Sequence, residues 1–208
     1  MKIALLLSGD LRDFAKRFSS LYENILEPLS PDVYLSSYET DDVESVIEKL
    51  KPKKYYLEKN NSFSVDEEIF LKDQPKHFDY IPKPINCVYM WRKIKQCFDL
   101  VSEHYDLIIR TRPDCHYTEK LDINKMSHEK INIPDGGDYE GGYFDMLSVA
   151  NTPNMKVYCN LYDNILTYRK VGVPLHSEIM LRMHLRGMDI NRFEFPVFLR
   201  DSQFNVKW

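Results

Sequence analysis

Short apolar runs alternate along this chain with longer segments in which apolar residues recur at the spacing of a helix. The first run covers residues 2–7, and helical spacing then continues from Leu11 to Leu29. Such an alternation of strand-like and helix-like segments is typical of α/β proteins, so we predict a three-layer α/β/α sandwich with a mostly parallel central sheet. Because the late strands have little helix between them, we expect this sheet to be mixed. Further strands are expected at 32–37, 54–57, 107–109, 130–133, 143–149 and 190–199, and further helices at 41–50, 86–104, 151–165 and 177–186.

Size and composition favour one globular domain over residues 1–208, with a hydrophobic fraction of 43% and a charged fraction of 29%. Whether this domain is a module of a longer polypeptide stays open. The net charge of −4 gives no basic excess, which argues against a nucleic-acid partner. No apolar run is long enough for a membrane span or a signal peptide, and the four cysteines have no CxxC spacing. We therefore expect reduced thiols and a cytoplasmic location, which is the host cytoplasm if the chain is viral.

Polar residues gather directly after the apolar run at 107–109, where Pro113 prevents the strand from continuing. In open α/β sheets, ligands bind at the carboxyl ends of the buried strands. Two guanidinium groups and a carboxylate at such an end indicate an anionic ligand, with a divalent metal as a further candidate. The alternative is an ordinary strand end with solvated charges. The polar residues concerned are Arg110, Arg112, Asp114 and His116.

Two segments interrupt the regular pattern. Residues 58–84 are polar and contain three prolines, which predicts a long variable loop, either functional or a solvated insertion, with at most one helical turn near 66–71. Residues 135–142 hold four of the seven glycines, so this segment either brings backbone amides close to a ligand or forms a flexible hairpin tip. The cluster Arg92, Lys93 and Lys95 is interpreted as a solvated basic face of the helix at 86–104.

Two further carboxylates occupy informative positions. Asp145 lies between Phe144 and Met146 in an apolar run, where an acidic residue is usually paired or functional. Glu178 lies in the first turn of a predicted helix, where a favourable interaction with the helix dipole is a purely local explanation.

Four pieces of the chain, taken in order, resemble a known family. They are SGDLRDF (8–14), IIRTRPD (108–114), YFDMLSVANTPNM (143–155) and LHSEIMLRMHLRGMDI (175–190). Together they resemble the nucleotide-diphospho-sugar glycosyltransferases of the GT-A fold, particularly small domains encoded by large DNA viruses and polysaccharide loci. The resemblance implies transfer of a sugar from a nucleotide-diphosphate sugar, with UDP as the expected nucleotide, to a glycan or a protein-linked acceptor.

The resemblance also implies roles for particular residues. Mn²⁺ or Mg²⁺ would be held by a DxD-like motif in which histidine replaces the second acid, together with a late histidine. The expected metal ligands are Asp114, His116 and His176. The expected nucleotide-binding residues are Leu7, Ser8, Gly9, Arg12, Arg110 and Arg112. The acids expected to contact the sugar or the acceptor, and to act in catalysis, are Asp145 and Glu178.

The chemistry of glycosyl transfer suits these residue types. A diphosphate leaving group gains charge, which a metal ion or the arginines can stabilise, and an inverting enzyme needs a carboxylate to accept the acceptor's proton. A retaining enzyme does not need that base, and the sequence leaves the two open. A non-catalytic nucleotide- or glycan-binding module of the same fold is the main alternative. A dinucleotide-binding enzyme is disfavoured, because SGDLRDF has one glycine where that fingerprint needs three.

Overall fold

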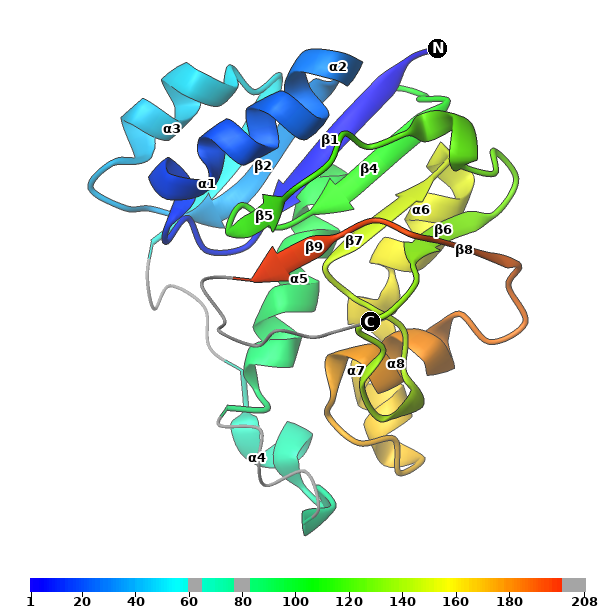
Figure 1. The fold of residues 1–208 in the computed structure, drawn as a ribbon. Helices are drawn as coiled ribbons and strands as arrows, with labels where there is room; N and C mark the ends of the chain where they lie inside the picture. The colour runs from blue at the N-terminus through cyan, green and yellow to red at the C-terminus, as the bar shows by residue number, and fades with distance from the viewer. Residues whose placement is uncertain (60–64, 77–82, 200–208) are drawn as a thin grey trace.

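The computed structural model describes residues 1–59, 65–76 and 83–199 as an α/β fold around a mixed seven-stranded sheet (Figure 1). The strands of this sheet follow the order β3-β2-β1-β4-β7-β6-β8, and β5 pairs with β9 in a separate two-stranded sheet. The strands are β1 (Ile3–Ser8), β2 (Asp32–Tyr38), β3 (Lys54–Glu58), β4 (Leu107–Thr111), β5 (Cys115–Tyr117), β6 (Ile131–Pro134), β7 (Leu147–Ala150), β8 (Ile190–Phe193) and β9 (Val197–Leu199). The helices are α1 (Phe14–Leu21), α2 (Glu27–Leu29), α3 (Val43–Leu50), α4 (Glu67–Leu71), α5 (Asn86–Asp99), α6 (Thr152–Cys159), α7 (Leu161–Lys170) and α8 (Ser177–His184).

The sheet is mostly parallel, as the sequence predicts. β1 pairs in parallel with β2 and with β4, and β2 pairs in parallel with β3. β7 runs antiparallel to its neighbours β4 and β6, whereas β8 is again parallel to β6. Every residue of β1 and β4 is buried, which explains why these two central strands are continuous apolar runs in the sequence.

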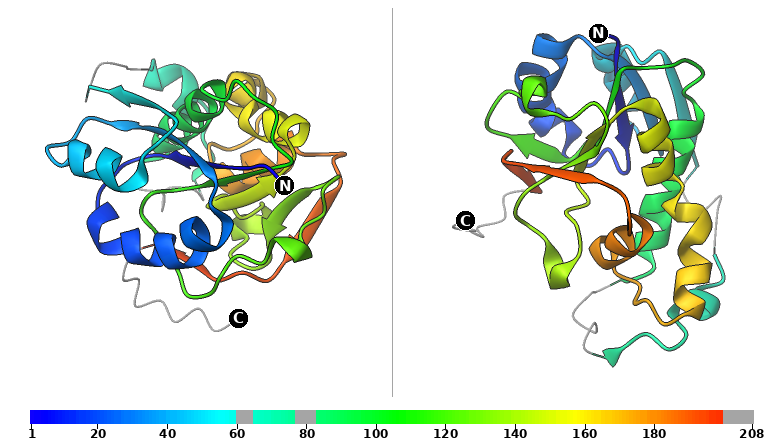
Figure 2. Two further views of the ribbon diagram at one scale, coloured as in Figure 1. Left: turned by 90° about the horizontal axis from the view of Figure 1, so that it is seen from above. Right: turned by 90° about the vertical axis from the view of Figure 1, so that its right-hand side faces the viewer.

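Helices lie on both sides of this sheet. α5 packs against β1 and β2, and α6 packs against β7 and β4. The right-hand view of Figure 2 shows α1 on the other side of the sheet from α5 and α6. Trp91 of α5 is fully buried and lies 5.4 Å, between ring centroids, from Tyr158 of α6, so the two helices share one core.

The predicted elements differ from the observed ones in several places. The strand expected at 143–149 begins only at Leu147, so Asp145 lies in the irregular segment before β7. The strand expected at 190–199 is divided between β8 and β9, which belong to different sheets. The helix expected at 151–165 ends at Cys159, and α7 then begins at Leu161. β5 was not predicted, because three residues carry too little periodicity.

Part of the predicted loop at 58–84 lies outside the described residues, and α4 occupies the place of its expected helical turn. All four cysteines are buried and unpaired, as expected of reduced thiols. Within the described ranges, no helix combines the length and the apolar character that crossing a bilayer requires.

Candidate functional site

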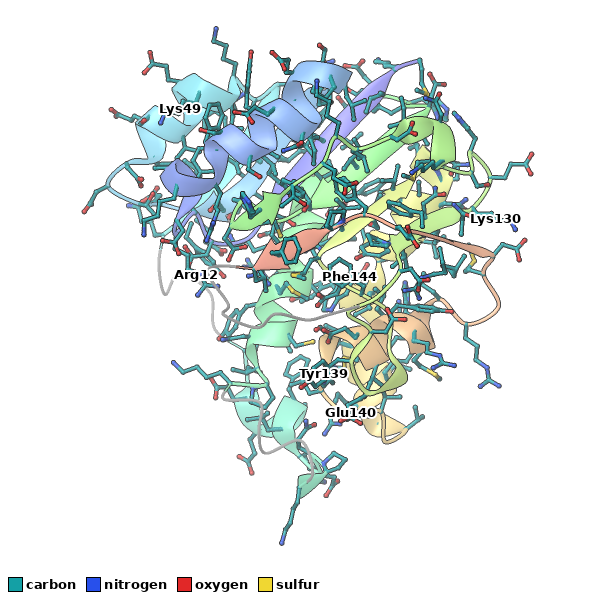
Figure 3. All side chains as sticks on the ribbon, viewed as in Figure 1. Arg12, Lys49, Lys130, Tyr139, Glu140 and Phe144 are labelled. Atoms are coloured by element: carbon teal, nitrogen blue, oxygen red, sulfur yellow. The ribbon has the colours of Figure 1, made fainter. Side chains whose placement is uncertain are left out.

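A cavity of about 1040 Å³ opens at the carboxyl ends of β1 and β4. From β1 the chain continues to β2 and β3 on one side, whereas β4 lies on its other side. Such a reversal of strand order leaves a crevice where open α/β sheets bind ligands. The walls of the cavity are the loop after β1, the start of α5, the segment before β7, the start of α8 and β9. Figure 3 shows three of its lining residues, Arg12 on the loop after β1 and Tyr139 and Phe144 on the segment before β7.

A cluster of two arginines beside the cavity is built around the carboxylate of Asp114. Arg112 donates to both of its oxygens, from Nε at 2.8 Å and from Nη2 at 2.9 Å. Nη2 of Arg12 approaches the same carboxylate at 3.4 Å from the loop after β1. Burial alone would raise the pKa of Asp114, but the hydrogen bonds and charge of Arg112 outweigh it and lower that pKa. Both arginines line the cavity, whereas Asp114 is 2% exposed and does not.

The loop after β1 brings its backbone close to the cluster of Arg12, Arg112 and Asp114. Gly9 adopts a φ of 127°, a region that favours glycine. Its carbonyl accepts a hydrogen bond from Oγ of Ser37 at 2.6 Å. Ser8 lines the cavity, and its Oγ is buried and has no hydrogen-bond partner among the described residues. Leu7 is fully buried and does not line the cavity, so of the residues predicted at this strand end Ser8, Gly9 and Arg12 reach it.

Arg110 also lies away from the cavity wall. Its side chain is fully buried, and Nη1 donates to the backbone carbonyl of Asp145. Nε and Nη2 have no partner within the part of the chain that the structure describes. Arg110 therefore holds the segment before β7 in place instead of reaching a ligand in the cavity.

A second buried cation lies beside the cavity on α5. Nζ of Lys93, whose side chain is 1% exposed, is 2.6 Å from Glu58 and 4.2 Å from the centroid of the Tyr38 ring. Arg92 makes a two-pronged ion pair with the same carboxylate, at 2.7 and 2.9 Å. The interpretation of Arg92 and Lys93 as a solvated basic face is therefore wrong, because both side chains are largely buried and paired with Glu58 at the end of β3.

Two of the carboxylates that line the cavity form a pair. Asp145 and Glu178 both line it, and the residues between β6 and α8 bring them together. Oε2 of Glu178 accepts a hydrogen bond from Oγ of Ser177 at 2.7 Å and lies 3.0 Å from Nδ1 of His176. His176 in turn stacks on the ring of Tyr139, with 6.0 Å between centroids.

The surroundings drive the pKa values of these two carboxylates in opposite directions. Burial and the nearby charge of Glu178 raise the pKa of Asp145. Burial would also raise the pKa of Glu178, but its hydrogen bonds with His176 and Ser177 outweigh burial and lower it. A pair of acids whose pKa values are separated in this way is typical of acid–base sites.

Gly142 lets the glycine-rich segment press against the start of α8. The backbone N–H of Tyr143 donates to the carbonyl of Glu178 at 3.0 Å, and Nη1 of Arg182 donates to the carbonyl of Gly141. A Cβ atom on Gly142 would lie 2.3 Å from the carbonyl carbon of Glu178. This close approach fixes the backbone that carries Glu178.

We expect Gly142→Ala to lower the free energy of unfolding by about 3 kcal/mol, the upper end of the cost of overpacking, because the new methyl meets backbone atoms. Urea unfolding measures this loss. Gly172→Ala is the matched control, since a Cβ there meets no atom within 4 Å and the cost of its left-handed backbone is about 1 kcal/mol. Equal losses in the two variants would contradict the close contact with Glu178.

The three predicted metal ligands do not form one donor set. Asp114 is enclosed by two guanidinium groups, and His176 is engaged with Glu178. His116 pairs with Phe198 between β5 and β9 and does not line the cavity. In residues 1–59, 65–76 and 83–199, no group of three or more histidine, cysteine or acidic side chains is arranged to hold a metal ion. These residues do not fit a divalent ion in the present arrangement.

The sequence analysis missed Lys93, Glu58 and Gly142. A usable signal existed for Lys93, because it lies between Trp91 and Ile94 on the apolar side of a predicted helix. Gly142 was recognised only as part of the glycine-rich segment at 135–142, since its close contact with Glu178 depends on α8. Comparison of the sequence with protein-family models and with curated proteins gives no match.

Proposed function

We propose that this chain is a sugar-nucleotide-dependent glycosyltransferase of the GT-A type. It transfers a sugar from a nucleotide-diphosphate sugar, with UDP as the expected nucleotide, to a glycan or protein-linked acceptor. One observation carries the proposal: a single cavity at the reversal of strand order is lined both by Arg12 and Arg112 and by the acidic pair Asp145 and Glu178. In this proposal the helices on the two sides of the sheet are the outer layers of a three-layer GT-A sandwich.

The charged residues that line the cavity suit the two halves of the reaction. Arg12 and Arg112 face the place where a leaving diphosphate gains negative charge, and fixed cations there stabilise the transition state. Asp145 has a raised pKa, which makes it the stronger base of the pair, and it accepts the proton of the acceptor hydroxyl. Glu178, held by Ser177 and His176, positions the sugar or the acceptor.

Nucleotide diphosphates are expected to stabilise the folded chain, since a ligand that binds only the folded state stabilises it by mass action. At about 100 times Kd the gain is about 2.7 kcal/mol, which raises Tm by about 5–10 °C for a domain of this size. Thermal unfolding with UDP, GDP, ADP and CDP, each with and without Mn²⁺, measures this shift. Uridine without phosphates is the control. No shift with any nucleotide diphosphate would contradict the proposed function.

A non-catalytic module is the second candidate. It is favoured by the enclosed carboxylate of Asp114, which departs from a DxD motif free to bind a metal. The two candidates differ in turnover. A module binds the nucleotide in the thermal assay, yet releases no nucleotide diphosphate from a panel of sugar nucleotides.

A further inference from the structure

We propose that the guanidinium groups of Arg12 and Arg112, held by Asp114, bind the diphosphate of the substrate without a divalent metal. This inference rests on the proposed function and concerns the same cavity. It replaces the metal site that the resemblance implies with an arginine site that the geometry supports.

The carboxylate of Asp114 is already fully engaged. Both of its oxygens accept hydrogen bonds from Arg112, at 2.8 and 2.9 Å, and Oδ2 also faces Nη2 of Arg12 at 3.4 Å. Its side chain is 3% exposed, so no face of it is open to the cavity. A divalent ion bound to this carboxylate would lie beside two guanidinium cations, and like charges at such separations repel strongly.

The arginines keep donors for a ligand. Arg112 uses Nε and Nη2 on Asp114, and Nη1 has no hydrogen-bond partner among the described residues. Arg12 likewise uses only Nη2 of its guanidinium, and its side chain is 50% exposed. Both side chains line the cavity. With one carboxylate between two guanidinium groups, this cluster keeps a net positive charge for an anion.

Ser8 supplies an independent indication of a ligand at this place. Ser8 lines the cavity and is 1% exposed, and its buried hydroxyl has no hydrogen-bond partner in the described part of the chain. A buried hydroxyl is normally satisfied, so an acceptor atom from outside the chain is expected there. Planar guanidinium groups match the geometry of phosphate oxygens, and a hydroxyl adds a further donor.

The test is calorimetric titration of the whole chain with UDP, GDP, ADP and CDP, and with pyrophosphate as a probe without a base. Each titration is done in excess EDTA and again in MnCl₂ after removal of EDTA. We expect binding in EDTA with a Kd within about threefold of the value in Mn²⁺, because charge-assisted hydrogen bonds from arginine supply the anion site.

Variants locate the anion site. Arg112→Gln is expected to weaken binding of the nucleotide diphosphate in EDTA about tenfold or more, and Arg12→Gln to weaken it several-fold, because each removes charge-assisted donors. Arg12 is half exposed, so its variant keeps the fold even if loss of Arg112 disturbs Asp114. Lys130→Met removes one positive charge from an exposed site remote from the cavity (Figure 3) and is expected to leave Kd unchanged.

The outcomes separate this inference from the function on which it rests. Binding that occurs in Mn²⁺ but not in EDTA overturns the inference and leaves the proposed function standing. Unchanged binding by both arginine variants also overturns it. Absence of binding to every nucleotide diphosphate and to pyrophosphate, with and without Mn²⁺, overturns the proposed function itself.

Discussion

Replacing Asp145 by asparagine is expected to lower the rate of sugar transfer by about 10²–10⁴-fold, the usual contribution of a positioned general base. The substitution keeps the size of the side chain and removes its ability to accept a proton. Nucleotide binding should change little, because Arg12, Arg112 and Asp114 are unaltered. Release of nucleotide diphosphate from sugar nucleotides, followed with acceptor present, measures the rate.

Asp135→Asn is the matched control for this experiment. Asp135 comes from the same segment before β7, but it is 66% exposed in its side chain and pairs with Arg192 at 3.3 Å outside the cavity. Its substitution is expected to leave the rate unchanged. Full activity in Asp145→Asn would remove the base from the proposed mechanism and favour a retaining enzyme, which does not need one.

The pH dependence of the reaction gives a second readout of Asp145. Burial and the charge of Glu178 raise its pKa above the ordinary value of 3.8, so it loses its negative charge at a higher pH than an exposed aspartate. We expect kcat/KM to fall as the pH drops through this raised pKa, because the protonated acid cannot act as a base. The acidic limb of the profile should be absent from whatever activity Asp145→Asn retains.

The fold could be predicted to a large extent because its central strands are buried on both faces. β1 and β4 therefore appear in the sequence as continuous apolar runs, and the helices between them repeat at helical spacing. The α/β class and the mostly parallel, mixed sheet follow from that pattern and are confirmed. The short strand β5 could not be found, and β9 was not separated from β8, since the pairing of β5 with β9 depends on a long-range contact and not on a local period.

The candidate site could be predicted only as separate pieces. Asp145 and Glu178 were each recognisable from their neighbours in the sequence, but their approach to each other depends on Gly142 and α8. The enclosure of the Asp114 carboxylate by two arginines could not be predicted, because one of them, Arg12, is remote in the sequence and is brought to it by β1. Local patterns therefore identified residue types, whereas long-range contacts decided what those residues can do.

Replacing Glu58 by glutamine is expected to lower the free energy of unfolding by about 3–5 kcal/mol, the cost of leaving a buried charge without its partner. Glu58 is 5% exposed and pairs with Lys93, which is 1% exposed, and with Arg92. Glutamine carries no charge, so neither cation would keep its ion pair. Urea unfolding at neutral pH measures the loss.

Glu103→Gln is the control that separates the effect of burial on stability from the effect of ion pairing. Glu103 also bridges two lysines, Lys2 and Lys53, but its side chain is 39% exposed. Exposed ion pairs contribute at most about 1 kcal/mol, so this variant should be nearly as stable as the parent chain. Equal effects of Glu58→Gln and Glu103→Gln would show that the network beside the cavity contributes no more than a surface pair.

The same network predicts how stability depends on pH. Hydrogen bonds from Arg92 and Lys93 outweigh burial and lower the pKa of Glu58 to about 2, from an ordinary value of 4.5. A carboxylate with a lowered pKa stabilises the folded state fully above its unfolded value, and that contribution is lost as the pH falls from about 4.5 through about 2. The difference in unfolding free energy between the parent chain and Glu58→Gln should therefore shrink over this window, because protonation of Glu58 removes the charge that glutamine already lacks. A difference that stays constant down to the lower end of the window would mean that Glu58 stabilises the fold by its shape and not by its charge.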